Sequence, residues 1–269
     1  MKTMIKIREV SCKIALSKSL LPGLDYSLNP YYGCQHGCVY CYAPNVLKIE
    51  REKWGKFVNI RRNMPKVLSK ELRKKEKGVV GISTVTDPYQ PLEKKFKLTR
   101  YCLQELLKYD FPICIQTKSD LVLRDVDLIS KFSHAEVGVT VATLNNNERT
   151  LLEPNSSSIQ KRLLALKKLK EGNIKTFVFF GPIYPTIELK DISKIVEIFA
   201  DCNVDYVMVD KFNLKRDVWE SIKNALSSEY KMMNIFYERF FIDREYYSKI
   251  FSAVKEECTK NNIGFEEAF

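Results

Sequence analysis

Three cysteines stand close together near the start of the chain, in the segment NPYYGCQHGCVYCYAP at residues 29–44. Cys34, Cys38 and Cys41 are separated by four and then three positions, and the proline and glycines around them favour a loop. A loop of this kind can turn three thiolates toward one centre. Soft thiolate ligands select iron–sulfur clusters, zinc or copper(I). The spacing therefore predicts a metal or cluster site.

The number of protein ligands distinguishes a zinc site from an iron–sulfur cluster site. Structural zinc takes four protein ligands, usually as two pairs, and no fourth Cys or His stands at partner spacing downstream. His36 lies inside the loop and would reach the same centre only in a cramped geometry. Three thiolates on a four-iron cluster leave one iron without a protein ligand, and an open iron is a site for a substrate or cofactor. The other cysteines are isolated: Cys12, Cys102, Cys114, Cys202 and Cys258. Of these, Cys102, Cys114 and Cys258 fall in strand or helix patterns and are predicted to be buried.

Strand-like and helix-like segments alternate after the cysteine loop and must position it. Five short runs are rich in β-branched or aromatic residues and predict strands, at 79–85, 111–116, 136–142, 175–180 and 204–209. Amphipathic segments between them predict helices, at 64–75, 99–108, 126–132, 157–170, 189–200 and 217–226. This alternation predicts the α/β class, with a parallel sheet covered by helices that is either open and doubly wound or barrel-like.

Polar residues follow the predicted strands directly, where the carboxyl ends of parallel strands would share one rim. They include Thr86 with Asp87, residues 117–119, Thr143, and Asp210 with Lys211. Ligands bind at this rim in both open sheets and barrels. The sequence therefore predicts a site at the carboxyl ends of the strands, next to the cysteine loop.

Length and composition exclude several classes of protein. The chain has 269 residues, 45% of them apolar, which suits one large domain or two small ones with a packed core. No apolar run is long enough to cross a membrane, and charges interrupt the first nine residues where a signal peptide would be apolar. We expect a cytoplasmic protein whose thiols stay reduced. A net charge of +11 favours anionic partners such as nucleic acid or phosphate-bearing substrates.

The cysteine spacing, with an aromatic Tyr40 just before the third cysteine, resembles the signature of the radical S-adenosylmethionine (SAM) superfamily. The wider sequence resembles its spore photoproduct lyase-like branch. Supporting matches run along most of the chain: residues 29–31, 86–93, 99–100, 116–119, 124–125, 153–154 and 181–185. The resemblance implies a partial (β/α)6 TIM-like barrel with the cluster loop after its first strand. It also implies a single radical SAM domain over 1–269, with a short N-terminal extension at about 1–25 and an aromatic-rich helical segment at about 230–269.

The resemblance implies specific cofactors and ligands. Cys34, Cys38 and Cys41 would hold a [4Fe-4S] cluster whose open iron binds SAM, and one electron would cleave SAM to a 5′-deoxyadenosyl radical that abstracts hydrogen from a substrate. Such chemistry needs an electron donor of the flavodoxin or ferredoxin type. The implied contacts of SAM are Tyr40 with the adenine, Thr86 and Asp87 with the methionyl amine or ribose, Lys118 with the carboxylate, a hydrogen bond from Thr140 or Thr143, and Glu153 and Arg162 completing the pocket.

One position departs from the branch. Spore photoproduct lyases carry a hydrogen-donating cysteine three residues before the strand-end aspartate, and Thr84 stands there in this chain. A hydroxyl is a poor donor of hydrogen atoms, so the thymine-dimer repair reaction is in doubt, although Tyr40 and Tyr42 match the tyrosine pair of those lyases. Cys114 is a weaker candidate for the donor.

Two functions stay open. The first is a radical SAM enzyme with an unidentified substrate. The positive net charge favours nucleic acid as that substrate. The second is a non-catalytic nucleic-acid-binding protein stabilised by zinc or an iron–sulfur cluster. A stretch that interleaves cations with an aromatic residue supports a nucleic-acid surface in either case: Lys48, Arg51, Lys53, Trp54, Lys56, Arg61 and Arg62.

Overall fold

A computed structural model describes residues 5–214 and 217–268. Its main sheet carries six consecutive parallel strands, and β11 (Gly264–Glu267) extends the parallel run beyond β10 while β2 (Leu16–Lys18) pairs antiparallel at the other edge. The six strands are β3 (Tyr26–Leu28), β6 (Val80–Ile82), β7 (Ile113–Thr117), β8 (Ala135–Thr140), β9 (Lys175–Phe180) and β10 (Tyr206–Val209). Within the described ranges β2 and β11 each pair on one side only and do not pair with each other, so the barrel is open. The predicted partial (β/α)6 barrel is confirmed.

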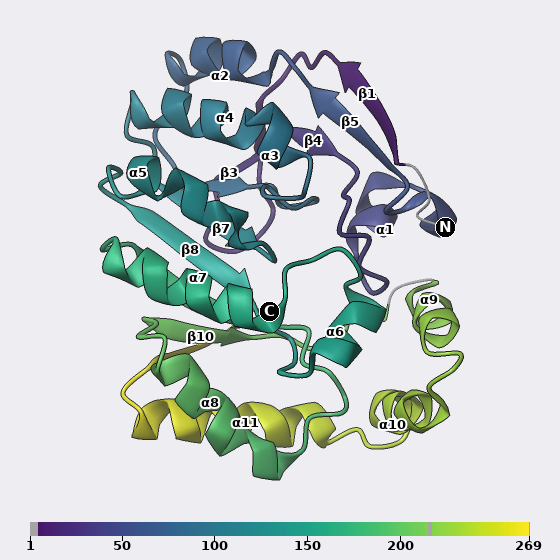
Figure 1. The fold of residues 1–269 in the computed structure, drawn as a ribbon. Helices are drawn as coiled ribbons and strands as arrows, with labels where there is room; N and C mark the ends of the chain where they lie inside the picture. The colour runs from purple at the N-terminus through teal and green to yellow at the C-terminus, as the bar shows by residue number, and fades with distance from the viewer. Residues whose placement is uncertain (1–4, 215–216, 269) are drawn as a thin grey trace.

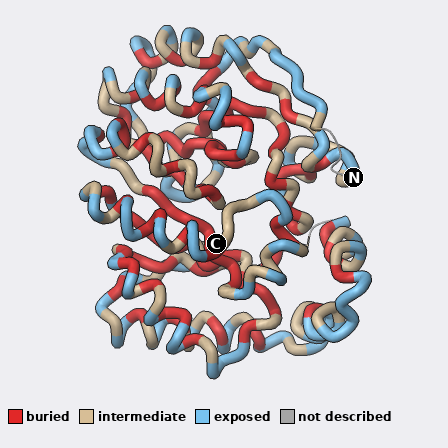
Figure 2. The backbone as a smooth tube through the Cα atoms, in the orientation of Figure 1, coloured by how far each residue is buried: buried red, intermediate tan, exposed pale blue. Residues whose placement is uncertain are grey.

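Helices cover the outer face of this sheet (Figure 1). They are α2 (Met64–Leu72), α4 (Leu98–Leu107), α5 (Val126–Ile129), α7 (Ile159–Glu171), α8 (Ile192–Ala200) and α11 (Tyr246–Lys260). Each predicted helix and strand occurs within a few residues of its expected position. Figure 2 shows buried backbone concentrated along the strands and the sheet-facing sides of the helices. Branched side chains such as Val137 and Val139 fill the layer between sheet and helices.

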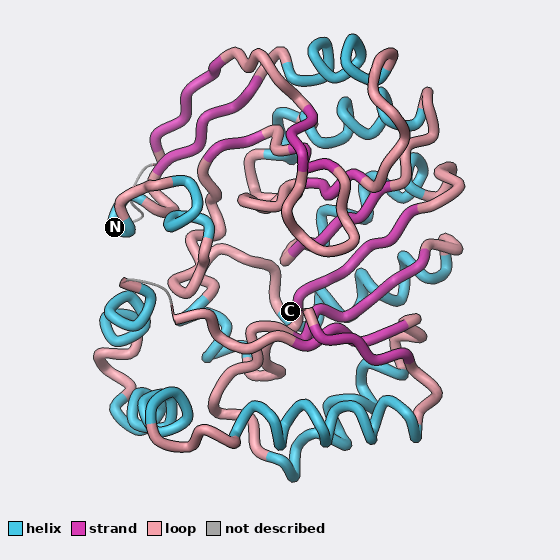
Figure 3. Tube along the Cα trace, turned by 180° about the vertical axis from the view of Figure 1, so that it is seen from behind, coloured by secondary structure: helices cyan, strands magenta, loops and turns pink. Residues whose placement is uncertain are grey.

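The opposite face of the sheet forms the interior of the barrel. Because side chains alternate along a strand, Ile113 and Ile115 of β7 point into the helix layer while Cys114 and Gln116 point inward. Figure 3 shows the strands and their connecting loops from behind. The carboxyl ends of the parallel strands therefore open toward the cysteine loop.

A second sheet, which the sequence patterns did not predict, supports that loop. It contains β1 (Lys6–Val10), β5 (Phe57–Arg61) and β4 (Tyr31–Tyr32), in the order β1-β5-β4. The loop follows β3, the first parallel strand, as expected, and ends at α1 (Ala43–Leu47). Part of the predicted N-terminal extension is thus an edge strand of this small sheet, and residues 1–4 of it lie outside the described residues.

The aromatic C-terminal segment forms α10 (Tyr230–Phe241), α11 and β11, and Phe269 lies outside the described residues. α10 packs against α9 (Val218–Ala225) through Trp219, whose ring lies 5.7 Å from that of Phe240. Figure 1 shows this pair set apart from the main row of helices. In the described part of the chain, no helix has the length and apolar character needed to cross a membrane.

Candidate functional site

The three cysteines line one cavity of about 180 Å³ at the carboxyl ends of β6, β7 and β8. Cys34 and Cys38 are buried and Cys41 is partly buried. The loop bends at Gly33 and Gly37, whose φ angles of 91° and 59° are left-handed. A Cβ on Gly33 would also lie 2.5 Å from the carbonyl oxygen of Phe57 on β5. Only glycine allows the loop to approach the small sheet this closely.

A buried glutamine ties the cysteine loop to the segment after β6. The Oε1 of Gln90 accepts a hydrogen bond from the backbone N–H of Gln35 at 2.9 Å, and its Nε2 donates to Thr86 Oγ1 at 3.0 Å. Thr86 in turn donates to the carbonyl of Gly33 at 2.8 Å. These bonds fix Thr86 at the cavity wall and show that its hydroxyl also holds the loop in place.

His36 and Asp87 make a second link between the loop and the strand ends. His36 Nδ1 lies 3.3 Å from Asp87 Oδ2, and both side chains are buried. Asp87 also accepts hydrogen bonds from Thr117 Oγ1 at 2.7 Å and from the backbone N–H of Lys118 at 2.8 Å. Burial acts to raise the pKa of Asp87, but His36 and these donors outweigh it and lower the pKa to about 2. Asp87 is therefore ionised at neutral pH and positions the loop through His36.

Lys118 supplies a fixed cation in the cavity. Its Nζ lies 3.5 Å from Thr140 Oγ1 and 5.9 Å from the centre of the Tyr40 ring. Burial acts to lower the pKa of Lys118, but the nearby Cys38 and Glu153 raise it above its ordinary value. The ammonium group thus stays charged beside the cysteines, at a place where it can bind a carboxylate.

Tyr40 lies behind the cavity wall rather than among the residues that line it. Its hydroxyl donates a hydrogen bond to Glu153, and its ring packs edge-on against Tyr184 and Phe212. Tyr42 does line the cavity, and its hydroxyl donates to the carbonyl of Thr84. Of the two tyrosines, Tyr42 is thus the one that a ligand in the cavity would touch.

Glu153 and Arg162 form a fully buried ion pair outside the cavity lining. Arg162 also donates to the carbonyl of Thr140 at 2.9 Å. This pair supports the strand end that carries Thr140, whereas Thr143 donates to Glu148 at 2.7 Å and does not line the cavity. The structure therefore places Thr140 in the lining of the cavity. Glu153, Arg162 and Thr143 are outside that lining.

The predicted basic and aromatic surface is wrong in three of its members, one of which is Arg61, a partly exposed residue that donates to the carbonyl of Asn29 at 3.1 Å. Trp54 is 8% exposed and lines the cavity. Arg51 is half-buried and donates to the carbonyl of Cys41 and to Asn45 Oδ1, both at 2.6 Å. These side chains were assigned to a surface because a short polar segment gives no sign of turning inward. Lys48, Lys53 and Lys56 are exposed as expected.

Sequence reasoning missed three residues at the site. Gln90 and Arg51 hold the cysteine loop, and Ser83 faces the cavity with a left-handed φ of 66°. Gln90 lay inside a motif quoted for the family resemblance, flanked by two prolines, and that rigid setting was the available signal. Nothing in the local sequence marked Ser83, and the sequence marked Arg51 only as part of a basic surface.

The donor set fits an iron–sulfur cluster. In residues 5–214 and 217–268, no three His, Cys, Asp or Glu side chains are close enough to share a single metal ion. A four-iron cluster does not need this closeness, because each thiolate binds a different iron. It needs three thiols that face one cavity, and Cys34, Cys38 and Cys41 do so. Burial raises the pKa of all three thiols, that of Cys34 to about 12, so metal binding must displace their protons.

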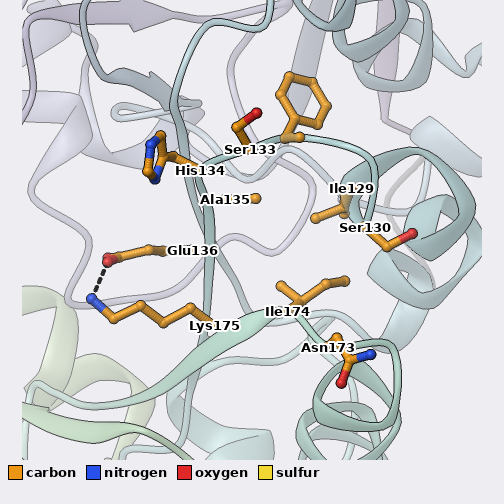
Figure 4. Close-up of a pocket in the computed structure, with 10 residues that line it drawn as sticks. Ile129, Ser130, Ser133, His134, Ala135, Glu136, Asn173, Ile174 and Lys175 are labelled. Atoms are coloured by element: carbon orange, nitrogen blue, oxygen red, sulfur yellow. Dashed lines mark hydrogen bonds and ion pairs between the residues drawn. The ribbon is translucent and has the colours of Figure 1, made fainter.

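A second cavity, of about 350 Å³, lies at the opposite end of the sheet (Figure 4). It is lined by residues at the starts of β8 and β9, including His134, Glu136 and Lys175, and the last two form an ion pair. This end of a barrel usually serves stability, while ligands bind at the carboxyl ends of the strands. The cysteine-lined cavity is therefore the candidate site.

An open parallel barrel with a cysteine-rich loop after its first strand defines a class of iron–sulfur enzymes. Residues 28–199 match the Radical SAM superfamily. A protein of Methanocaldococcus jannaschii with no characterised function is 41% identical over 197 residues, covering 73% of this chain and 74% of the relative. A Radical SAM Nalpha-GlyT isomerase of Pseudomonas phage M6 is 23% identical over 183 residues, covering 67% of this chain and 38% of the isomerase.

Among solved structures, a point mutant of spore photoproduct lyase is similar with a TM-score of 0.73 at 12% identity, covering 98% of this chain and 81% of that one. A further structure of that lyase, with bound AdoMet and a dinucleoside spore photoproduct, gives a TM-score of 0.70. The chain belongs to the radical SAM superfamily. It is therefore an enzyme that uses SAM together with an iron–sulfur cluster, and its fold is that of spore photoproduct lyase.

Proposed function

We propose that Cys34, Cys38 and Cys41 hold a [4Fe-4S] cluster and that SAM binds its open iron in the same cavity. When bound and reduced, the cluster supplies the electron that cleaves SAM to methionine and a 5′-deoxyadenosyl radical, which abstracts hydrogen from the substrate. The observation that carries this proposal is that three thiols and the cation of Lys118 line one cavity at the carboxyl ends of the strands. The N-terminal extension, the barrel and the C-terminal helices would form one radical SAM domain.

The residues around the cysteines bind and orient SAM in this proposal. Lys118 pairs with the methionyl carboxylate, and Thr140, held by Arg162, adds a hydroxyl beside it. Thr86 and Asp87 contact the methionyl amine or the ribose from the end of β6. For the adenine, the predicted contact is Tyr40, whose ring lies 5.9 Å from the ammonium group of Lys118, while Tyr42 lines the cavity.

Nucleic acid is the proposed substrate class. The net charge of +11 supports it. A base would have to leave its stack to reach a radical inside the barrel. The electron donor would be a flavodoxin- or ferredoxin-like protein, and the enzyme would work in the cytoplasm. The competing function is a non-catalytic nucleic-acid-binding protein stabilised by zinc or an iron–sulfur cluster. Such a protein would hold its metal without cleaving SAM.

An anaerobic assay tests the proposal. Protein reconstituted with iron and sulfide should hold about four irons per chain and release 5′-deoxyadenosine from SAM when dithionite is added. Substrate-dependent stimulation by single-stranded DNA, tRNA or a metabolite pool would then identify the substrate class. A colourless protein with one zinc per chain and no cleavage of SAM would instead establish the binding protein.

Lys118→Met tests the predicted contact with the carboxylate. Loss of a charge-assisted bond should raise the KM for SAM about tenfold to a hundredfold while the iron content stays at the wild-type value. Lys53→Met, at an exposed lysine near the loop, is the matched control and should leave the KM unchanged. An unchanged KM in Lys118→Met would remove the carboxylate contact from the proposal.

A further inference from the structure

The cysteine-lined cavity extends past the predicted SAM contacts into the interior of the barrel. The part of the cavity that is called the inner chamber here is lined by Leu21, Leu24, Gly81, Ser83, Cys114 and Gln116. Gly81 and Cys114 are register partners on the neighbouring strands β6 and β7. Leu24 packs over Gly81, where a Cβ would lie only 2.5 Å from its Cδ1. The lining of the chamber thus combines the apolar side chains of two leucines with polar side chains.

Ser83 presents a buried hydroxyl without a partner to this chamber. The side chain is 6% exposed, and its Oγ makes no hydrogen bond to any part of the described chain. Leaving a buried hydroxyl unpaired costs about 1–3 kcal/mol. The left-handed backbone at φ 66° adds strain that glycine would avoid. Strained residues with unsatisfied polar groups cluster at functional sites, where a ligand completes the hydrogen bonding.

Gln116 adds a carboxamide on the adjacent strand. Gln116 is an exposed residue that lines the cavity, and its side chain makes no hydrogen bond with another described residue. A carboxamide offers donors and an acceptor side by side and carries no charge. A group with a matching donor and acceptor edge can therefore make two hydrogen bonds to it at once.

The charges nearest the chamber have partners once SAM is bound. Glu136, the register partner of Cys114 on β8, forms an ion pair with Lys175 and accepts a hydrogen bond from Tyr206 at 3.1 Å. Lys118 lines the same cavity and keeps its charge, and in the proposed function the methionyl carboxylate of SAM neutralises it. With SAM bound, an ionised group that entered the chamber would lose hydration without gaining a free counter-charge, which is costly. The chamber therefore favours a neutral occupant.

We propose that the inner chamber binds an uncharged, amide-like group of the substrate, with a hydrogen-bond donor and acceptor on one edge, and that Gln116 and Ser83 determine this specificity. Its role as a substrate site rests on the proposed function. Its preference for neutral amides is measured without turnover, in protein from which the charge of Lys118 has been removed.

The rate at which the Cys114 thiol is alkylated measures which small groups enter the chamber. Iodoacetamide and iodoacetate alkylate a thiolate in the same way, with displacement of iodide, but one carries a neutral amide and the other a carboxylate. The cluster-loaded Lys118→Met protein, which lacks the free cation of the cavity, is treated with each reagent anaerobically at one pH, and the labelling of Cys114 is followed by mass spectrometry. Taking the ratio of the two rates removes the effect of thiol ionisation. We expect this ratio to exceed that of free cysteine about threefold to tenfold, the factor that one neutral hydrogen bond supports.

Variants assign the preference to the named residues. Gln116→Leu should return the ratio toward that of free cysteine, Ser83→Ala should lower it in part, and Gln116→Lys should reverse it in favour of iodoacetate. Cys12, which is partly exposed, is the internal reference and should keep one ratio in all variants. Ser83→Ala adds no bulk, so it tests the proposal even where a Gln116 variant fails to fold.

Three results would overturn the proposal: a ratio at Cys114 equal to that of free cysteine, a wild-type ratio in both Gln116→Leu and Ser83→Ala, or no labelling of Cys114 by either reagent. Failure of the proposed function is distinguishable, because it would show as absent cleavage of SAM with the amide preference intact. The converse result, cleavage of SAM without the preference, would remove the chamber's specificity alone.

Discussion

The phenol of Tyr40 donates a hydrogen bond to the carboxylate of Glu153, which lies 113 residues further along the chain. The second oxygen of that carboxylate forms an ion pair with Arg162, and both charged side chains are fully buried. A backbone hydrogen bond of 3.0 Å from Val39 to Leu152 runs alongside. The cysteine loop is thereby fastened to the segment that follows α6 (Asn146–Leu152).

Glu153→Gln should destabilise the iron-free protein strongly. The replacement keeps the shape but leaves the Arg162 guanidinium buried without a counter-charge, a change that typically costs about 3–5 kcal/mol. Urea denaturation measures the effect. Glu188→Gln removes an exposed pair with Lys190 and should lower the stability far less. Equal losses in the two variants would contradict the structural role of the buried pair.

Cys38→Ala should abolish iron retention and cleavage of SAM together, because two thiolates cannot hold the cluster. Iron analysis and a 5′-deoxyadenosine assay on the same reconstituted sample measure both. Cys102→Ala is the matched control, since Cys102 is a buried thiol of the hydrophobic core. That variant should keep its iron, although its core cavity will lower its stability. Normal iron content in Cys38→Ala would disprove the ligand assignment.

Arg51→Gln should shift the midpoint potential of the reconstituted cluster to more negative values. The guanidinium donates to the carbonyl of Cys41, and a positive charge at that position stabilises the more negative, reduced state. We expect the ratio of reduced to oxidised cluster at a fixed potential to fall about tenfold, which is about 59 mV for one electron.

A redox titration followed by EPR measures this shift. Arg51→Lys, which keeps the charge, should restore most of the potential even where the loop is less rigid. Lys53→Gln removes an exposed charge paired with Glu50 and should leave the potential unchanged. An unaltered potential in Arg51→Gln would show that Arg51 only fixes the loop.

Asp210→Asn should stabilise the protein at pH 7.5 and have little effect near pH 4.5. Burial raises the pKa of Asp210 at the end of β10 from 3.8 to about 6, against the weaker opposing effect of Lys211. Because the folded state disfavours the ionised form, wild-type stability falls as the pH rises from about 4 through 6. The variant avoids this loss, worth about 1–2 kcal/mol after solvent screening. Thermal melts at the two pH values measure it, and an equal effect at both would contradict the raised pKa.

Local sequence was sufficient for the alternation of parallel strands and helices, the family resemblance supplied the barrel, and the cysteine spacing singled out three thiols that line one cavity. The strand at Lys175–Phe180 and the helix at Met64–Leu72 follow from short-range periodicity, which each segment carries by itself. The cysteine spacing is equally local, since three thiols within eight residues need only a bent loop to face one cavity. The small sheet was missed because β1 and β4 are paired through β5, a contact between distant segments that neither sequence shows alone.

Only the tertiary structure decided which polar residues meet at the site. The sequence placed Tyr40, Glu153 and Arg162 in one pocket with SAM, but packing against Tyr184 and Phe212 puts the Tyr40 ring behind the wall. Gln90 and Ser83 entered the site through backbone turns whose direction depends on the neighbouring strands. The physical reason is that periodicity records which face of a strand or helix is buried, whereas the partner of a buried polar group can come from a distant chain segment, as Glu153 does for Tyr40 across 113 residues.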